Sequence, residues 1–203
     1  MVTVHPTARV ETEDVGEGTI IGAFCYIGKN VFIGKNCRIG AFTSIGGAPQ
    51  YKSPIMTEEN GIIILDNVVT KEFVTINLPV GRHTFIGTNC YLMTKSHIAH
   101  DVELQNDVIV CSGAAISGFS RIGKFTYIGA NASVHQHSDI GSYCIVGASS
   151  FFKGSSPEGI TWAGVRAKPI KVNLINIKRN APKEERGPII FRAQEYCNQL
   201  QGG

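Results

Sequence analysis

The feature that most limits how this chain can fold is an aliphatic residue that recurs every six positions. In the first part of the chain each of these residues is followed by glycine: Ile21, Ile27, Ile33, Ile39 and Ile45. After an interruption the same spacing runs from Ile86 to Val146 without a change of register. A period of six fits the two-residue alternation of a strand but not the 3.6-residue turn of a helix. The pattern therefore predicts short β-strands that repeat along a solenoid.

A second inward position follows four residues after each aliphatic. It holds small or β-branched side chains, among them Val31, Thr43, Ser96, Val102, Val108, Ala114, Ser120, Thr126, Ala132 and Ser150. Glycine and asparagine between the inward positions suit tight corners with unusual dihedral angles. Four of the six cysteines also occupy the second inward position: Cys25, Cys37, Cys90 and Cys144. With no CxxC pair, we expect reduced core thiols rather than disulfides or zinc ligands.

Two segments interrupt the repeat. Residues 46–63 break the spacing and carry two prolines, so we expect a loop insertion there, and the register shifts again near residues 79–84. Beyond Val146 the pattern fades. The sequence predicts an all-β fold over residues 1–180, a parallel β-helix, with a short helical tail over residues 181–203.

The tail is expected to form a short amphipathic helix that Gly187 and Pro188 interrupt. At 203 residues and 43% hydrophobic content, the whole chain has the size of one domain or of one domain with a short appendage. The formal net charge is only +3, and lysine and arginine are spread along the chain rather than clustered between aromatic residues, so there is no reason to expect nucleic acid as a partner. No apolar run reaches the roughly 20 residues of a membrane span, and residues 1–5 lack the features of a signal peptide, so we expect a cytoplasmic protein.

The hexads resemble those of the left-handed β-helix acyltransferase superfamily, in which three hexads form one triangular coil. The left hand comes from this resemblance alone, because crossovers between parallel strands otherwise favour the right hand. On a coil of eighteen residues, His100 stacks with Gly118 and Gln136, and His97 stacks with Ala115. The simpler interpretation of an outward histidine on such a fold is a solvated surface residue.

A local string makes a functional interpretation stronger. Residues 96–101, Ser-His-Ile-Ala-His-Asp, together with residues 133–136, Ser-Val-His-Gln, resemble the signature of the UDP-N-acetylglucosamine acyltransferases, the LpxA family. The resemblance extends from about residue 5 to residue 179. It implies that His100 is the general base with Asp101 beside it, and that the backbone N–H of Gly118 receives the oxyanion.

The same resemblance implies contacts to the substrates. His135 and Gln136 match a substrate-binding motif, Asn173 and Arg179 match elements near the nucleotide and the carrier, and His97 lies in the signature string. The remaining assigned positions are Gln50 in a loop that binds the sugar nucleotide, Ala148 along the acyl chain, and Arg166. Arg166 is one of several basic residues that could meet coenzyme A phosphates or an acidic carrier protein, or form a solvated basic edge: Lys153, Arg166, Lys168, Lys171, Lys178 and Arg179.

The chemistry suits these groups. Acyl transfer from a thioester requires an acceptor hydroxyl or amine to lose a proton as it attacks, and a neutral imidazole can take that proton. One preplaced N–H donor typically contributes about 3 kcal/mol to oxyanion stabilisation. No cofactor is expected beyond an acyl-coenzyme A or acyl carrier protein co-substrate, and the resemblance implies a homotrimer with active sites between subunits.

Four departures from the family pattern bear on the substrate. The aspartate expected after Gln50 is Tyr51, a His-Arg pair is Asn77-Leu78, a further histidine is Phe119, and a glycine is Ala148. We expect a paralogue that acylates a modified or amino sugar on nitrogen, with a shorter or differently shaped acyl group. The alternative is a true UDP-N-acetylglucosamine 3-O-acyltransferase of lipid A synthesis, in which these changes are neutral.

Two other classes stay open. A metal enzyme similar to the γ-class carbonic anhydrases would use histidines such as His97, His100, His135 and His137, but their spacings do not fit that family. We therefore predict no metal site. A non-catalytic binding module is also compatible with the fold, because fold alone does not prove function, but it gives no reason for His100, Gly118 and Gln136 to share a column.

Overall fold

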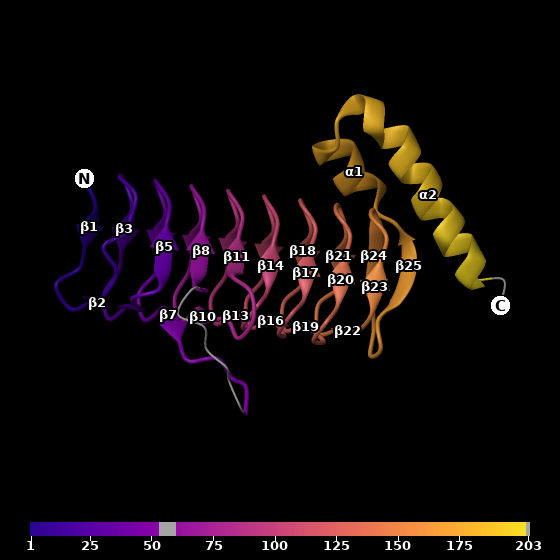
Figure 1. Cartoon of the computed structure of the whole chain (residues 1–203). Helices are drawn as coiled ribbons and strands as arrows, with labels where there is room; N and C mark the ends of the chain where they lie inside the picture. Colours follow the sequence, from indigo (N-terminus) through magenta and orange to yellow (C-terminus); the bar gives the residue numbers. More distant parts are fainter. Residues whose placement is uncertain (53–59, 202–203) are drawn as a thin grey trace.

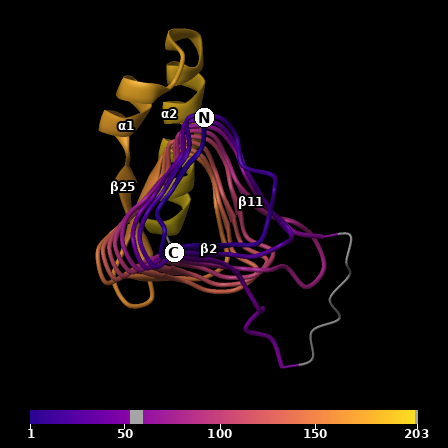
Figure 2. The same cartoon turned by 90° about the vertical axis from the view of Figure 1, so that its left-hand side faces the viewer.

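The computed structural model describes residues 1–52 and 60–201. Short strands stack along one axis, and two helices lie at the C-terminal end (Figure 1). Viewed along the axis, the coils have a triangular outline (Figure 2). Each side of the triangle is one sheet, with ten, eight and seven strands respectively. All strand pairs are parallel except the last pair of the ten-stranded sheet, so the predicted parallel β-helix is confirmed.

The strand bounds are as follows. The ten-stranded sheet contains β1 (Thr3–Val4), β3 (Ile20–Ile21), β6 (Arg38–Ile39), β9 (Val69–Thr70), β12 (Tyr91–Leu92), β15 (Ile109–Val110), β18 (Tyr127–Ile128), β21 (Ile145–Val146), β24 (Ile160–Ala163) and β25 (Lys168–Val172). The eight-stranded sheet contains β2 (Arg9–Val10), β4 (Tyr26–Ile27), β7 (Ser44–Gly47), β10 (Thr75–Asn77), β13 (His97–Ile98), β16 (Ala115–Ile116), β19 (Ser133–Val134) and β22 (Phe151–Phe152). The seven-stranded sheet contains β5 (Val31–Ile33), β8 (Ile62–Ile64), β11 (Thr84–Ile86), β14 (Glu103–Leu104), β17 (Arg121–Ile122), β20 (Asp139–Ile140) and β23 (Ser155–Ser156).

The strand register confirms the eighteen-residue coil. His97 pairs with Ala115 and Ala115 pairs with Ser133. The residue after each of these points inward, and Ile98, Ile116 and Val134 are fully buried. The hexad positions therefore form ladders of aliphatic side chains, which supply the apolar burial that holds successive coils together.

The corners have left-handed backbone geometry. A residue three positions after the aliphatic has a φ between 55° and 61° at fifteen corners where it is not glycine. Asparagine tolerates this region, as predicted, but phenylalanine occupies it at five corners: Phe24, Phe42, Phe73, Phe119 and Phe125. Stacking offsets part of the strain, because the rings of Phe24 and Phe42 lie 4.9 Å apart and those of Phe42 and Phe73 5.0 Å apart.

The six cysteines are free and buried, as predicted for the four that occupy the second inward position of a hexad. The Cys90 thiol donates to the Gln105 carbonyl oxygen at 3.1 Å. Burial raises the pKa of Cys90 to about 12 and that of Cys144 to about 11. These thiols are therefore protonated core groups at neutral pH.

The chain leaves the prism twice at the corner between the eight-stranded and seven-stranded sheets (Figure 2). The first departure lies between β7 and β8, inside the predicted insertion of residues 46–63, of which residues 53–59 lie outside the described residues. The second is the loop of residues 78–83 between β10 and β11, where the sequence predicted a shift. Past Val146 the coils continue through β22 and β23. The hexad spacing is lost there because the corner between these two strands is shorter than the earlier corners.

The C-terminal region differs from the prediction in two ways. Helix α1 (Leu174–Asn180) begins before the expected boundary at residue 181, because Asn173 caps it by accepting a hydrogen bond from the Asn176 N–H. Helix α2 (Lys183–Gln201) runs through Gly187 and Pro188 without interruption. Pro188 lies in the second turn, where its missing N–H removes only one helical hydrogen bond. Buried side chains attach both helices to the end of the solenoid: Ile177, Ile189, Ala193 and Cys197.

Candidate active site

His100, Gly118 and Gln136 occupy one column at the corner between the eight-stranded and seven-stranded sheets. The Phe119 N–H donates to the His100 carbonyl oxygen, and the His137 N–H donates to the Gly118 carbonyl oxygen. A Cβ atom at position 118 would lie 2.3 Å from His100 Cε1. The imidazole therefore lies directly against Gly118, and a larger residue there would displace the ring.

A buried carboxylate orients the His100 ring. His100 Nδ1 lies 2.8 Å from Asp101 Oδ2, and the two residues are 6% and 0% exposed. Asp101 also accepts backbone N–H groups from Val80, Gly81 and Arg82 at 2.8, 2.8 and 2.6 Å. Burial would raise the pKa of Asp101, but these three amides and His100 together hold it below its usual value. An ionised Asp101 accepts a hydrogen only from a protonated Nδ1, so Nε2 of the neutral ring is left as the proton acceptor.

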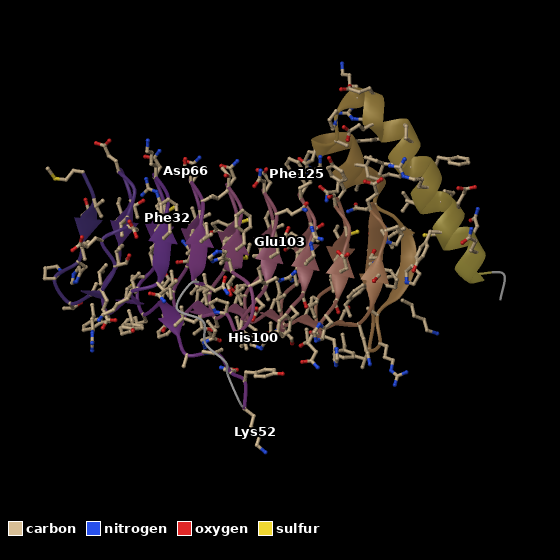
Figure 3. The ribbon with its side chains drawn as sticks, in the orientation of Figure 1. Phe32, Lys52, Asp66, His100, Glu103 and Phe125 are labelled. Carbon is tan, nitrogen blue, oxygen red and sulfur yellow. The ribbon has the colours of Figure 1, made fainter. Side chains whose placement is uncertain are left out.

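Aromatic rings surround the imidazole. Tyr51 and Phe119 each meet it edge to face, with centroids 5.4 and 5.1 Å away. Phe119 in turn stacks on His137 at 4.9 Å. Gln50, the predicted substrate contact beside Tyr51, has an exposed side chain. Figure 3 shows His100 at the edge of the prism from which the segment that contains Lys52 projects.

His97 lies on the outer face of β13, close to this corner. Its Nδ1 is 2.8 Å from Thr75 Oγ1. Burial lowers the pKa of His97, and the nearby charge of His100 lowers it further. His97 is therefore neutral at neutral pH and available for hydrogen bonding rather than for charge pairing.

A cavity of about 530 Å³ continues the same corner toward the C-terminal end. It brings together two predicted site residues, His135 from the end of β19 and Arg166 from the turn between β24 and β25. The His135 ring meets Phe151 edge to face, and its Nδ1 lies 3.0 Å from the Gln136 carbonyl oxygen. Lys153 adds a second cation to the lining, so the cavity is suited to an anionic group.

Three predicted site residues lie elsewhere on the chain. Asn173 and Arg179 line a second cavity of about 720 Å³ over the ten-stranded sheet. Phe125, which also lines it, lies at the edge of the prism opposite His100 (Figure 3). Ala148 is exposed at the third corner, between the ten-stranded and eight-stranded sheets. Within one chain, the structure does not bring these residues to His100.

Sequence reasoning missed the loop of residues 78–83. The shift of register marked its position, but nothing in its composition predicts that three of its amides bind Asp101. Arg82 was also missed, although its Nε donates to the Asp101 carbonyl oxygen and its Nη2 to the Phe119 carbonyl oxygen, at 3.1 and 3.2 Å.

The histidines that a metal enzyme would require do not converge. His100 is bonded to Asp101, His97 to Thr75, and His137 stacks on Phe119. Within residues 1–52 and 60–201, no three histidine, cysteine, aspartate or glutamate side chains are arranged to hold a metal ion.

Comparison with known proteins shows which proteins this chain is similar to. A family model described as bacterial transferase hexapeptide (six repeats) matches residues 14–47. The acyl-[acyl-carrier-protein]–UDP-N-acetylglucosamine O-acyltransferase of Herminiimonas arsenicoxydans is 33% identical over 147 residues, which cover 71% of this chain and 56% of that protein. Its counterpart in Campylobacter concisus is 33% identical over 154 residues, with the same coverage. The chain thus spans little more than half the length of these relatives.

Solved structures share the fold. The UDP-N-acetylglucosamine acyltransferase from Campylobacter jejuni superposes with a TM-score of 0.78 at 27% identity, over 93% of this chain and 82% of that one. LpxA from Bacteroides fragilis gives a TM-score of 0.78 at 26% identity, over 96% and 81%. The chain is therefore a left-handed parallel β-helix of the hexapeptide-repeat superfamily. Within that superfamily it resembles the LpxA-like family of UDP-N-acetylglucosamine acyltransferases.

Proposed function

We propose that this chain is an acyltransferase that moves an acyl group from a coenzyme A or acyl carrier protein thioester onto a nucleotide-linked sugar. The observation that carries the proposal is the arrangement at the corner. An imidazole oriented by a buried carboxylate lies directly against a glycine in the next coil. The relatives with this fold are named as acyltransferases that act on UDP-N-acetylglucosamine.

In the proposed reaction, His100 transfers the proton and the Gly118 N–H binds the oxyanion. His100 Nε2 takes the proton of the acceptor hydroxyl or amine as the acceptor attacks the thioester carbonyl. The Gly118 N–H, which takes part in no hydrogen bond among the described residues, receives the resulting oxyanion. Collapse of the intermediate expels the thiolate, which takes the proton back from His100. The base typically contributes about 10²–10⁴ in rate, and one oxyanion donor contributes about 10²–10³.

The substrates are proposed to lie along the same corner. His97, His135 and Gln136 flank the reacting centre and would bind the sugar. The cavity between His135 and Arg166 would take the phosphates of the acyl donor, because Lys153 and Arg166 both border it. We place the reaction in the cytoplasm. Within residues 1–52 and 60–201, no helix is long and apolar enough to cross a bilayer.

We propose that the active enzyme is a homotrimer with its sites between subunits. Asn173, Arg179 and Ala148 lie away from His100 in one chain, so they can serve the same reaction only if a neighbouring subunit supplies them. A symmetric assembly can place the cavity near Arg179 of one subunit beside the His100 corner of the next. Light scattering on the purified protein tests the assembly, and a monomeric active enzyme would contradict it.

For the acceptor, we propose a modified or amino sugar that is acylated on nitrogen. Asn77 is buried, and its amide donates to the Ala48 carbonyl oxygen at 2.9 Å rather than pointing to the site. Phe119 places an apolar ring against His100. Asn77 and Phe119 each stand where the family pattern has a histidine that would face the sugar. The second candidate, 3-O-acylation of UDP-N-acetylglucosamine in lipid A synthesis, is favoured by the names of the relatives.

The test incubates the protein with acyl-coenzyme A and acyl carrier protein donors and a panel of UDP- and dTDP-linked sugars, and detects product by mass spectrometry. A His100→Ala variant is compared at pH 7 and pH 9. An amine acceptor loses its proton to solvent at high pH, so the defect of the variant should shrink; a hydroxyl acceptor keeps the full defect. No product with any pair would contradict the proposed activity, and product only on a sugar hydroxyl would select the second candidate.

A further inference from the structure

The loop of residues 78–83 is folded back onto the corner that carries His100. Besides the three backbone amides that bind the Asp101 carboxylate, the loop contributes the Arg82 side chain. Its Nε donates to the Asp101 carbonyl oxygen at 3.1 Å, and its Nη2 donates to the Phe119 carbonyl oxygen at 3.2 Å. Asp101 and Phe119 are corner residues of successive coils, so one guanidinium links two coils beside the site.

The carbonyl groups of Asp101 and Phe119 occupy equivalent positions at their corners. Asp101 and Phe119 have φ angles of 59° and 60°, the left-handed geometry of these corners. The hydrogen bonds between coils use the carbonyl one residue earlier, since His100 accepts from the Phe119 N–H and Gly118 accepts from the His137 N–H. The coil-to-coil ladder therefore leaves the carbonyls of Asp101 and Phe119 unused, and Arg82 binds both.

A second corner uses the same arrangement. Near α1, the Asn173 side chain donates to the Tyr143 carbonyl oxygen at 2.9 Å, and the Asn176 side chain donates to the Phe125 carbonyl oxygen. Tyr143 and Phe125 are again left-handed corner residues of successive coils. Side chains from outside the repeat thus hold neighbouring coils together at two corners, one of which carries the proposed catalytic groups.

We propose that Arg82 is a positioning residue that fixes the spacing between the His100–Asp101 pair and the corner formed by Gly118 and Phe119. This inference rests on the proposed function. The proton acceptor and the oxyanion donor belong to different coils, so their separation depends on how firmly the two coils are joined at this edge. A displacement of about 1 Å at a reacting centre can cost on the order of 10² in rate.

The guanidinium is suited to this task. Its planar fork presents several donors in fixed directions, whereas a lysine ammonium is a flexible point charge. The loop has other anchors, because Asn60 Nδ2 donates to the Gly81 carbonyl oxygen and the Gly61 N–H donates to His83 Nδ1. Removal of the Arg82 side chain should therefore loosen the two corners without releasing the whole loop.

The test compares Arg82→Met, Arg82→Lys and a matched control, Arg38→Met. Arg38 is also an exposed arginine on the prism, but it lies in β6 of the ten-stranded sheet, on a coil that carries neither His100 nor Gly118. Amide hydrogen exchange is followed at Phe119 and His137, whose N–H groups join the coils at this corner. We expect Arg82→Met to speed exchange there about tenfold, Arg82→Lys to give an intermediate value, and the control to match the wild type.

Kinetics on the substrate pair found for the wild type complete the test. Arg82→Met should lower kcat by about 10–100-fold with KM changed by less than about twofold, and Arg82→Lys should restore part of the loss. Unchanged exchange in Arg82→Met, or faster exchange with unchanged kcat, would overturn the positioning role. A wild type that transfers no acyl group would overturn the proposed function instead, so the two failures are distinguishable.

Discussion

The His100 ring lies so close to Gly118 that a Cβ atom added at position 118 would come within 2.3 Å of Cε1, 2.6 Å of Nε2 and 2.9 Å of Nδ1. The two residues belong to successive coils, and their contact joins the proposed base to the proposed oxyanion donor. The tightness of this contact gives the first prediction.

Gly118→Ala should fold but lose activity. The new methyl group displaces the imidazole, so we expect kcat to fall by on the order of 10²–10⁴, the typical contribution of a general base, with little change in the circular dichroism spectrum. Gly187→Ala is the matched control, because no atom lies within 4 Å of its Cβ position in α2. The control should keep its activity and gain about 0.5–1 kcal/mol in stability. Equal activity of Gly118→Ala and wild type would contradict the arrangement.

Asp101 should make the stability of the protein depend on acid. Its folded-state pKa lies below the ordinary value of about 3.9. The ionised carboxylate therefore contributes stability that is fully present above pH of about 4, and this contribution is lost as the pH falls through the folded-state pKa. Urea unfolding of wild type and Asp101→Asn should differ most at neutral pH, and the difference should shrink toward pH of about 2. A constant difference across this range would show that Asp101 is not ionised in the folded state.

His97 should titrate below its ordinary pKa. Burial is the main cause of the lowered pKa of His97, and the charge of His100 lowers it further. The unfolded chain then binds a proton more readily than the folded one, so this residue contributes stability that is lost as the pH falls below about 6.5. Nuclear magnetic resonance of the imidazole signals, assigned with a His97→Gln variant, measures the midpoint directly. A midpoint above about 6.5 would be the opposite result.

The stacked rings of Phe24, Phe42 and Phe73 should stabilise the first coils. Phe42 makes both stacks, each typically worth about 0.5–1.5 kcal/mol. Phe42→Ala should therefore lower the free energy of unfolding by about 1–3 kcal/mol. Phe42→Asn should cost less, because asparagine tolerates the φ of 57° better than alanine does. Chemical denaturation of both variants measures which loses more stability. A Phe42→Ala variant that is more stable than Phe42→Asn would contradict the prediction.

The six cysteines should be unreactive in the folded protein. All are buried, and burial raises the pKa of Cys90 to about 12. A colorimetric thiol reagent should therefore label none of them rapidly under native conditions and all six after unfolding. Fast labelling of the native protein would show that the core is less closed than the structure indicates.

Periodicity explains why much of this fold could be predicted. Each hexad repeats one local choice of inward and outward residues, so a constant spacing fixes which residues stack. The column of His100, Gly118 and Gln136 follows from that arithmetic, and the resemblance to known acyltransferases added the hand and the proposed roles. Four of the six buried cysteines were predicted by the same reasoning.

The unpredicted features lie where the repeat stops. The amides of residues 80–82 bind Asp101 only after the loop folds back, and no period marks that path. Pro188 suggested a break, but a proline in the second turn of α2 removes too little hydrogen bonding to end the helix. Asn173 and Arg179 share a cavity over the ten-stranded sheet. The eighteen-residue spacing shows which residues of one chain stack, so it cannot relate this cavity to His100.

The most direct test of the central claim is the single-turnover rate of acyl transfer by wild type and His100→Ala, measured at neutral pH with the same donor and acceptor. If His100 is the base, the rate should fall by about 10²–10⁴ while the variant still binds both substrates. Equal rates for the two proteins would contradict the assignment of His100, and with it the account of how this corner works.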